Sequence, residues 1–87
     1  MTLSIEQVKV VLGGVTRDAE DVIAEIQGMC DRLDEATVRL RDTASGSSHQ
    51  KADEAIRYLQ QARDRLEEAG ILARGAVGAA GVYRSLI

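Results

Sequence analysis

Residues 5–40 read IEQVKVVLGGVTRDAEDVIAEIQGMCDRLDEATVRL, and apolar residues recur through this stretch at alternating steps of three and four. A spacing that averages 3.5 residues keeps one stripe of a helix facing a neighbouring helix along its whole length. The stretch therefore predicts one long helix that packs lengthwise against another. The stripe runs through Ile5, Val8, Leu12, Val15, Ala19, Val22, Ile26, Met29, Leu33, Ala36 and Leu40.

A second stripe with the same spacing follows a cluster of small residues at 44–48, and Gly46 in this cluster can take the left-handed conformation that ends helices. Two rods of equal length joined by a short turn are expected to fold back antiparallel. We predict an all-α fold, an antiparallel two-helix hairpin that forms a single domain over 1–87. The helices are expected at about 5–43 and 48–86, with a turn at about 44–47 formed by Ser45, Gly46 and Ser47.

Both helix starts carry a capping signal. Ser4 with Gln7, and Ser47 with Gln50, have the S-x-x-Q spacing of a capping box, in which two side chains satisfy free backbone amides. The absence of Pro, Phe and Trp also suits helices built from aliphatic residues and alanine.

Two sets of apolar residues are expected to make contacts. The predicted seam between the helices consists of Ile5, Val8, Leu12, Val15, Val22, Ile26, Met29, Leu33, Leu40, Leu59, Leu66, Ala69, Ala73, Ala76, Ala80 and Tyr83. A lone hairpin cannot also cover the flanking set, which consists of Val11, Ile23, Cys30, Ile56, Tyr58, Leu72, Val77 and Leu86. We therefore expect a homodimer, or a heterodimer with a similar hairpin, that forms a four-helix bundle. The alternative is a monomer with scattered surface apolar residues.

Glycines gather at the end of the predicted hairpin away from the turn, although each costs about 1 kcal/mol inside a helix. A turn centred near residue 45 or 46 would place Gly13 and Gly14 beside Gly78 and Val77. We favour close packing of the helices through small residues; the alternative is a loosened end that recognises another molecule. Segment 69–82 carries only Arg74 as a charge, is too short to span a bilayer and lacks the cationic face of an interfacial helix, so membrane contact is not expected.

The sequence offers no arrangement that suits catalysis or metal binding. Cys30 is the one cysteine and His49 the one histidine, which leaves no disulfide, no cysteine-rich metal site and no inward pair of Glu-x-x-His motifs. We expect His49 to be a solvated polar residue near the start of the second helix. The net charge of -3 without a basic block argues against nucleic acid. The sequence thus predicts a non-enzymatic protein with no cofactor, metal or small-molecule substrate.

Residues 1–6 lack the basic region and apolar core of a signal peptide, so we expect a cytoplasmic protein. Two long helices joined by Ala44-Ser45-Gly46 resemble the small helical-hairpin proteins exported by type VII (ESX-like) secretion, whose turn carries Trp-x-Gly. Gly46 matches the glycine of that motif, and Ala44 stands at the tryptophan. Tyr83 is placed like the late tyrosine of the family's export signal, and Ile87 stands where the family has an acidic residue. The resemblance implies a protein–protein interaction role and export without a cleavable signal peptide, alone or through a partner. The alternative is a cytosolic structural or adaptor bundle.

Overall fold

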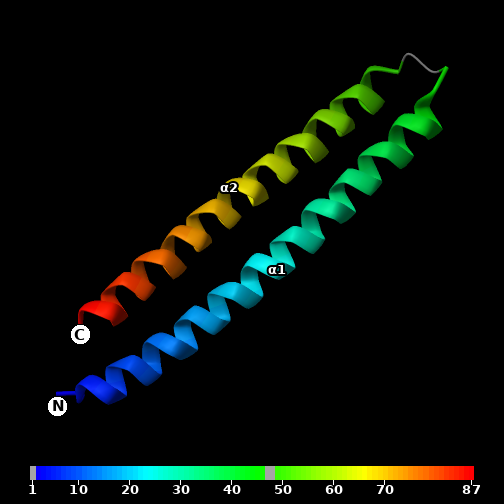
Figure 1. The fold of residues 1–87 in the computed structure, drawn as a ribbon. Helices are drawn as coiled ribbons and strands as arrows, with labels where there is room; N and C mark the ends of the chain where they lie inside the picture. Colours follow the sequence, from blue (N-terminus) through cyan, green and yellow to red (C-terminus); the bar gives the residue numbers. More distant parts are fainter. Residues whose placement is uncertain (1, 47–48) are drawn as a thin grey trace.

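The computed structural model describes residues 2–46 and 49–87 and contains two helices, α1 (Ile5–Ala44) and α2 (Gln50–Leu86). The helices lie antiparallel, with both termini at one end of the molecule and the turn at the other (Figure 1). The predicted all-α helical hairpin is confirmed. Helix α1 ends one residue later than expected, and α2 begins two residues later. No helix in these two described ranges is long and apolar enough to cross a membrane.

Helix α1 begins with the capping box that its sequence predicts. The Ser4 hydroxyl accepts a hydrogen bond from the Gln7 backbone N–H at 3.1 Å, and Gln7 Oε1 accepts one from the Ser4 backbone N–H at 2.9 Å. Because the first amides of a helix have no partner within it, this reciprocal pair fixes the start of α1.

The turn differs from the prediction in how α2 is capped. Gly46 has a φ of 83°, the left-handed conformation expected of it, and follows the last turn of α1. The cap of α2 is His49, whose Nδ1 accepts a hydrogen bond from the Lys51 backbone N–H at 3.1 Å. The imidazole therefore serves the helix terminus and is not merely a solvated side chain. Ser47, predicted as a turn and capping residue, lies outside the described residues.

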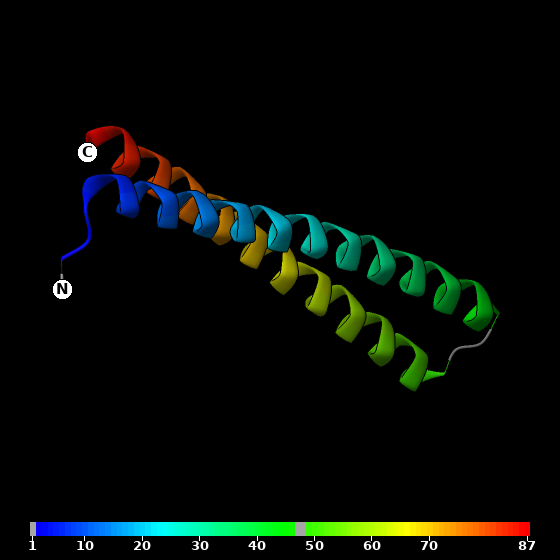
Figure 2. The ribbon, with the colours of Figure 1, turned by 90° about the horizontal axis from the view of Figure 1, so that it is seen from below.

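The molecule is a single layer of two helices. Its extents are 64 × 22 × 14 Å, and its radius of gyration is 19.6 Å, whereas a compact chain of this length would have a radius of gyration of about 12 Å. Seen from below, the helices cross at a shallow angle (Figure 2). Each helix consequently has one side against its neighbour and most of its circumference exposed.

The interior of this hairpin is small. Among the described residues the buried ones are Ile26, Cys30, Thr37 and Gly70, and no side chain there is fully buried. Thr37 satisfies its hydroxyl within α1 by donating to the Leu33 carbonyl at 2.8 Å. The two helices thus meet along a narrow line and do not enclose a core.

Most helix glycines do not serve close packing. A methyl group added at Gly70 would lie 3.6 Å from Ile26 Cγ2, and one at Gly13 would lie 3.8 Å from the Arg84 guanidinium, both ordinary contact distances. The expected pairing of Gly13 with Gly78 is wrong, because the connection between the helices extends to residue 49 and shifts their register. Methyl groups at the remaining helix glycines would meet nothing within 4 Å, so the close packing that we favoured does not explain them; these are Gly14, Gly28, Gly75, Gly78 and Gly81.

Candidate functional site

One row of the predicted seam on each helix lies in the contact between the helices. Each row consists of residues seven apart that are buried or half-buried in the structure. On α1 the row is Leu12, Ala19, Ile26, Leu33 and Leu40, and on α2 it is Leu59, Leu66, Ala73 and Ala80.

The second row in the contact is displaced by one residue from the prediction on both helices. Val15, Val22 and Met29 are 53%, 45% and 41% exposed, and the predicted seam residues Ile5, Ala69, Ala76 and Tyr83 are also exposed, while Val8 is half-buried. Their places are taken by buried or half-buried residues one position along the chain, which are Thr16, Ile23, Cys30 and Thr37 on α1 and Ile56, Arg63, Gly70 and Val77 on α2.

The residues predicted to make dimer contacts are consequently divided between two environments. Ile23, Cys30, Ile56 and Val77 belong to the contact within the hairpin. The other members of that set remain exposed, and they are Val11, Tyr58, Leu72 and Leu86.

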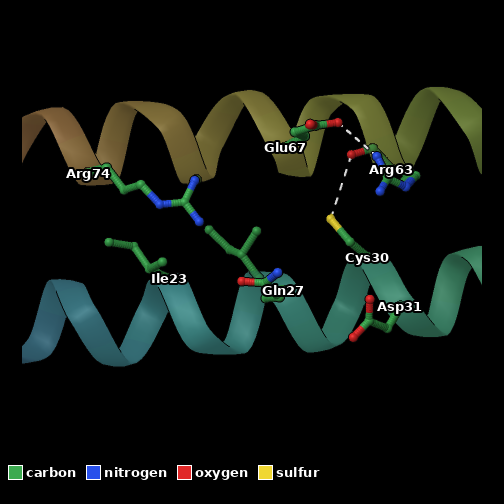
Figure 3. A pocket seen from close by; sticks show the side chains of 9 residues that line it. Ile23, Gln27, Cys30, Asp31, Arg63, Glu67 and Arg74 are labelled. Atoms are coloured by element: carbon green, nitrogen blue, oxygen red, sulfur yellow. Dashed lines mark hydrogen bonds and ion pairs between the residues drawn. The ribbon is translucent and has the colours of Figure 1, made fainter.

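Polar residues occupy the side of the hairpin on which the displaced rows lie. A hollow on this side is lined by Ile23, Gln27 and Cys30 of α1 and by Arg63 and Arg74 of α2, among others (Figure 3). The Cys30 thiol points across it toward α2 and donates a long hydrogen bond to the Arg63 carbonyl, with an S···O distance of 3.8 Å. We call this side the polar face.

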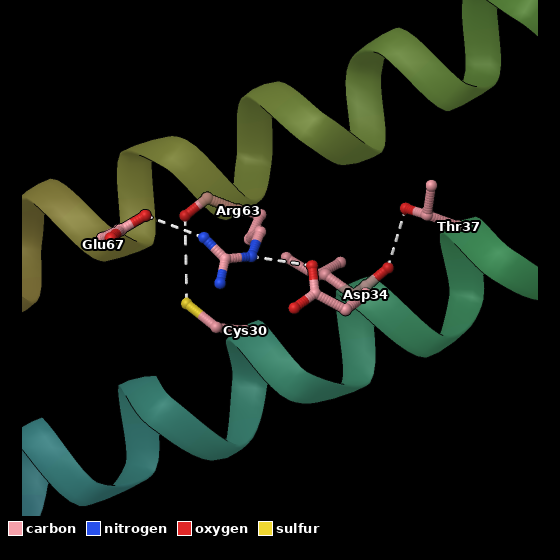
Figure 4. A network of polar contacts seen from close by, with 6 residues as sticks. Cys30, Asp34, Thr37, Arg63 and Glu67 are labelled. Carbon is pink, nitrogen blue, oxygen red and sulfur yellow. Dashed lines mark hydrogen bonds and ion pairs between the residues drawn. The ribbon is translucent and has the colours of Figure 1, made fainter.

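Arg63 connects the two helices on the polar face. Its Nε donates to Asp34 Oδ1 of α1 at 2.7 Å, and its Nη1 donates to Glu67 of α2 at 2.7 Å (Figure 4). The hydrogen bond to Asp34 and the negative charges of Asp34 and Glu67 raise the pKa of the Arg63 guanidinium above its ordinary value. The side chain is about one-third exposed, so this pair adds little to stability.

The opposite side of the hairpin carries apolar rows beside the contact between the helices. Met29, Arg32 and Leu33 of α1 line a groove on this side together with Leu66 of α2. Residues seven apart continue along one row of a helix, so Val15 and Val22 lie in the Met29 row, and the row beside Leu66 is made of alanines and Tyr83. We call this surface the apolar face, defined by the exposed residues Val15, Val22, Met29, Ala62, Ala69, Ala76 and Tyr83.

The displacement of one row on each helix amounts to a rotation of both helices about their own axes. Its physical reason lies in contacts between the helices, which the spacing of apolar residues on one helix does not reveal. Gly70 lets Ile26 approach α2 closely, and Arg63 bonds to Asp34 only when both face the same side. The spacing of apolar residues does not predict Thr16, Thr37, Arg63 and Gly70 as contact residues, because they are polar or lack a side chain. The sequence did carry a signal for them, because they recur every seven residues, one position after the row that was predicted.

The described part of the chain holds no group of three His, Cys, Asp or Glu residues placed to bind a metal ion. Cys30 is a buried thiol, and the described His49 caps a helix at the turn. The feature that the fold leaves unused is therefore a surface, the apolar face.

Comparison with known proteins adds no relative, since no family model, no curated protein and no solved structure matches this chain.

Proposed function

We propose that this chain is a non-enzymatic protein–protein interaction module whose apolar face packs against a helical partner to complete a bundle. The observation that carries the proposal is the rotation of the two helices. Of two adjacent rows on α1, the contact within the hairpin uses the one that contains Thr16, Cys30 and Thr37, and the row that contains Val15, Val22 and Met29 faces solvent. Large apolar residues left at heptad spacing on a surface are typical of an interface with another helix.

The surface area of the hairpin supports the proposal. The accessible surface is 6660 Å², whereas a folded monomer of 9.4 kDa is expected to expose about 5,000 Å². The excess is larger than the roughly 800 Å² that each partner buries in a standard interface. Burial of about 800 Å² against one partner on the apolar face would therefore remove about half of this excess.

A matched pair of variants tests the proposal. Val22→Glu places a charge in the middle of the apolar face, and Gln27→Glu places the same charge on the polar face; Val22 and Gln27 are both exposed, so neither change should unfold the hairpin. We expect Val22→Glu to abolish association in gel filtration and in pull-downs of proteins encoded beside this chain. Gln27→Glu should retain it. Equal behaviour of the two variants would contradict the proposal.

Export by a type VII-like system is a second candidate, favoured by Gly46. The glycine stands at the position of the motif glycine in the turn and has a φ of 83°. In this proposal the chain leaves the cell with a helical partner that carries the export signal. The test is an assay of culture supernatants from cells that express the chain with and without its neighbouring genes. A chain confined to cells in both cases would favour the alternative, a cytosolic adaptor bundle.

A further inference from the structure

The apolar face has one row of large residues and one row of small residues. The α1 row contains Val15, Val22 and Met29, and the α2 row contains Ala62, Ala69 and Ala76. Helices pack well when large side chains of one enter the space above small side chains of another. A surface that offers one row of each kind is complementary to itself.

The register of the hairpin places these rows level with each other. Gly13 lies beside Arg84 and Gly70 lies against Ile26. Counting along both helices from these contacts places Val22 level with residues 74–75, within two residues of Ala76, and Met29 level with residues 67–68, within two residues of Ala69. Val22 and Met29 thus each have a small counterpart at nearly the same height along the rod, and the counterpart of Val15 is Tyr83.

From this arrangement we infer that the partner on the apolar face is a second copy of this chain, related by a two-fold axis parallel to the rods, so that both turns lie at the same end. The inference rests on the proposed function and names the partner of the same surface. The rotation places α1 of each copy over α2 of the other and preserves height, so Val22 meets Ala76 of the partner. Large residues then face small ones in the middle of the interface, and Val15 faces Tyr83 of the partner near the termini.

The other two-fold arrangement fits less well. An axis across the rods would put the turns at opposite ends and would place α1 against α1, so that the row of Val22 faces the same row of the partner and alanines face alanines. The two α1 helices would be held apart by their large side chains, and the two α2 helices would leave a gap between their alanines. Loosely packed interfaces of this kind lose contact energy.

The apolar face is also large enough for a stable dimer. The two longer extents of the hairpin, 64 and 22 Å, give the face a projected area of roughly 1,400 Å², against the roughly 800 Å² per partner of a standard interface. The interface could therefore leave its edges solvated and still bury the area that a specific dimer requires.

Distances between spin labels at the turn test the inference. Ser45 is exposed and lies off the apolar face, so a label on Ser45→Cys reports the turn without disturbing the interface. The background is Cys30→Ser, because serine retains a donor toward the Arg63 carbonyl. We expect pulsed electron paramagnetic resonance to give an intermolecular distance comparable to the 22 Å and 14 Å widths of the rod. Val22→Glu should remove this distance and weaken dimerisation by about 100-fold or more, because it buries unpaired charge.

Three other outcomes would overturn the inference, and they differ in what they leave standing. A distance near the 64 Å length of the rod would replace the shared-turn arrangement by the opposite one and would leave the proposed function intact. A 9.4 kDa species at every concentration in sedimentation, with no intermolecular distance, would exclude a second copy. If that monomer bound a hydrophobic dye and Val22→Glu did not, the face would remain open to a different helical partner. If neither bound the dye, the proposed function would fail as well.

Discussion

Replacing Gly75, Gly78 and Gly81 together by alanine should stabilise this protein. All three lie inside α2 (Gln50–Leu86), and an added methyl group at each would meet nothing within 4 Å. Alanine is favoured over glycine in a helix interior by about 0.5–1 kcal/mol per position. The three changes should therefore add about 2 kcal/mol to the free energy of unfolding, which for a domain of this size corresponds to a rise of roughly 8–16 °C in Tm.

Thermal melts and urea titrations followed by far-UV circular dichroism measure this effect. Protein concentrations must be matched, because association couples Tm to concentration. Gly46→Ala is the control with the opposite sign, since a φ of 83° costs a residue with a side chain about 1–2 kcal/mol. A lower Tm in the triple variant would refute the reasoning, because it would show that the three glycines are in contact with something that an added methyl group displaces.

Three further substitutions test the contacts that define the hairpin. Ser4→Ala removes the capping box and should cost about 0.5–2 kcal/mol, seen as faster hydrogen exchange in the first turn of α1. Ile26→Ala should cost about 2–3 kcal/mol in urea titrations because Ile26 is 9% exposed, whereas Val38→Ala, at 53% exposure, should change stability little; equal effects would contradict the described contact. Asp34→Asn breaks the ion pair with Arg63 and should lower the urea midpoint slightly at low salt. The difference should vanish in 1 M salt, where the Debye length is about 3 Å, and its persistence there would show that the pair acts through packing.

Much of the fold follows from the sequence for reasons internal to each helix. The spacing from Ile5 to Leu40 requires one long helix, the Ser4 and Gln7 pair marks its start, and Gly46 marks the reversal, because each depends on residues a few positions apart. The cap of α2 was harder to predict, since His49 serves through Nδ1 in a role more often taken by serine or aspartate. Local signals therefore fix the elements and their bounds to within about two residues.

The rotation of the helices could not be predicted in the same way. A stripe with alternating steps of three and four has two phases that share every second residue, and Leu12, Ile26 and Leu33 belong to both. The choice between the phases depends on contacts between the helices, such as Gly70 against Ile26. Counting apolar residues selects the phase with Val22, because it favours the most apolar stripe whatever that stripe faces. The spacing therefore identified most residues of the apolar face, but it assigned them to the contact between the two helices.

The polar face determines which surface the hairpin offers to a partner. The bond from Arg63 to Asp34 and the contact of Gly70 with Ile26 turn both helices toward the same side. Because both are turned in the same sense, the row of Val22 and the row of Ala76 come to lie on one side of the hairpin. Rotation in opposite senses would have placed those rows on opposite sides, and neither side alone would have formed a broad apolar surface. Because the ion pair is exposed, it can favour this orientation by no more than the small free energy that it adds to stability, and the contact of Gly70 with Ile26 acts with it.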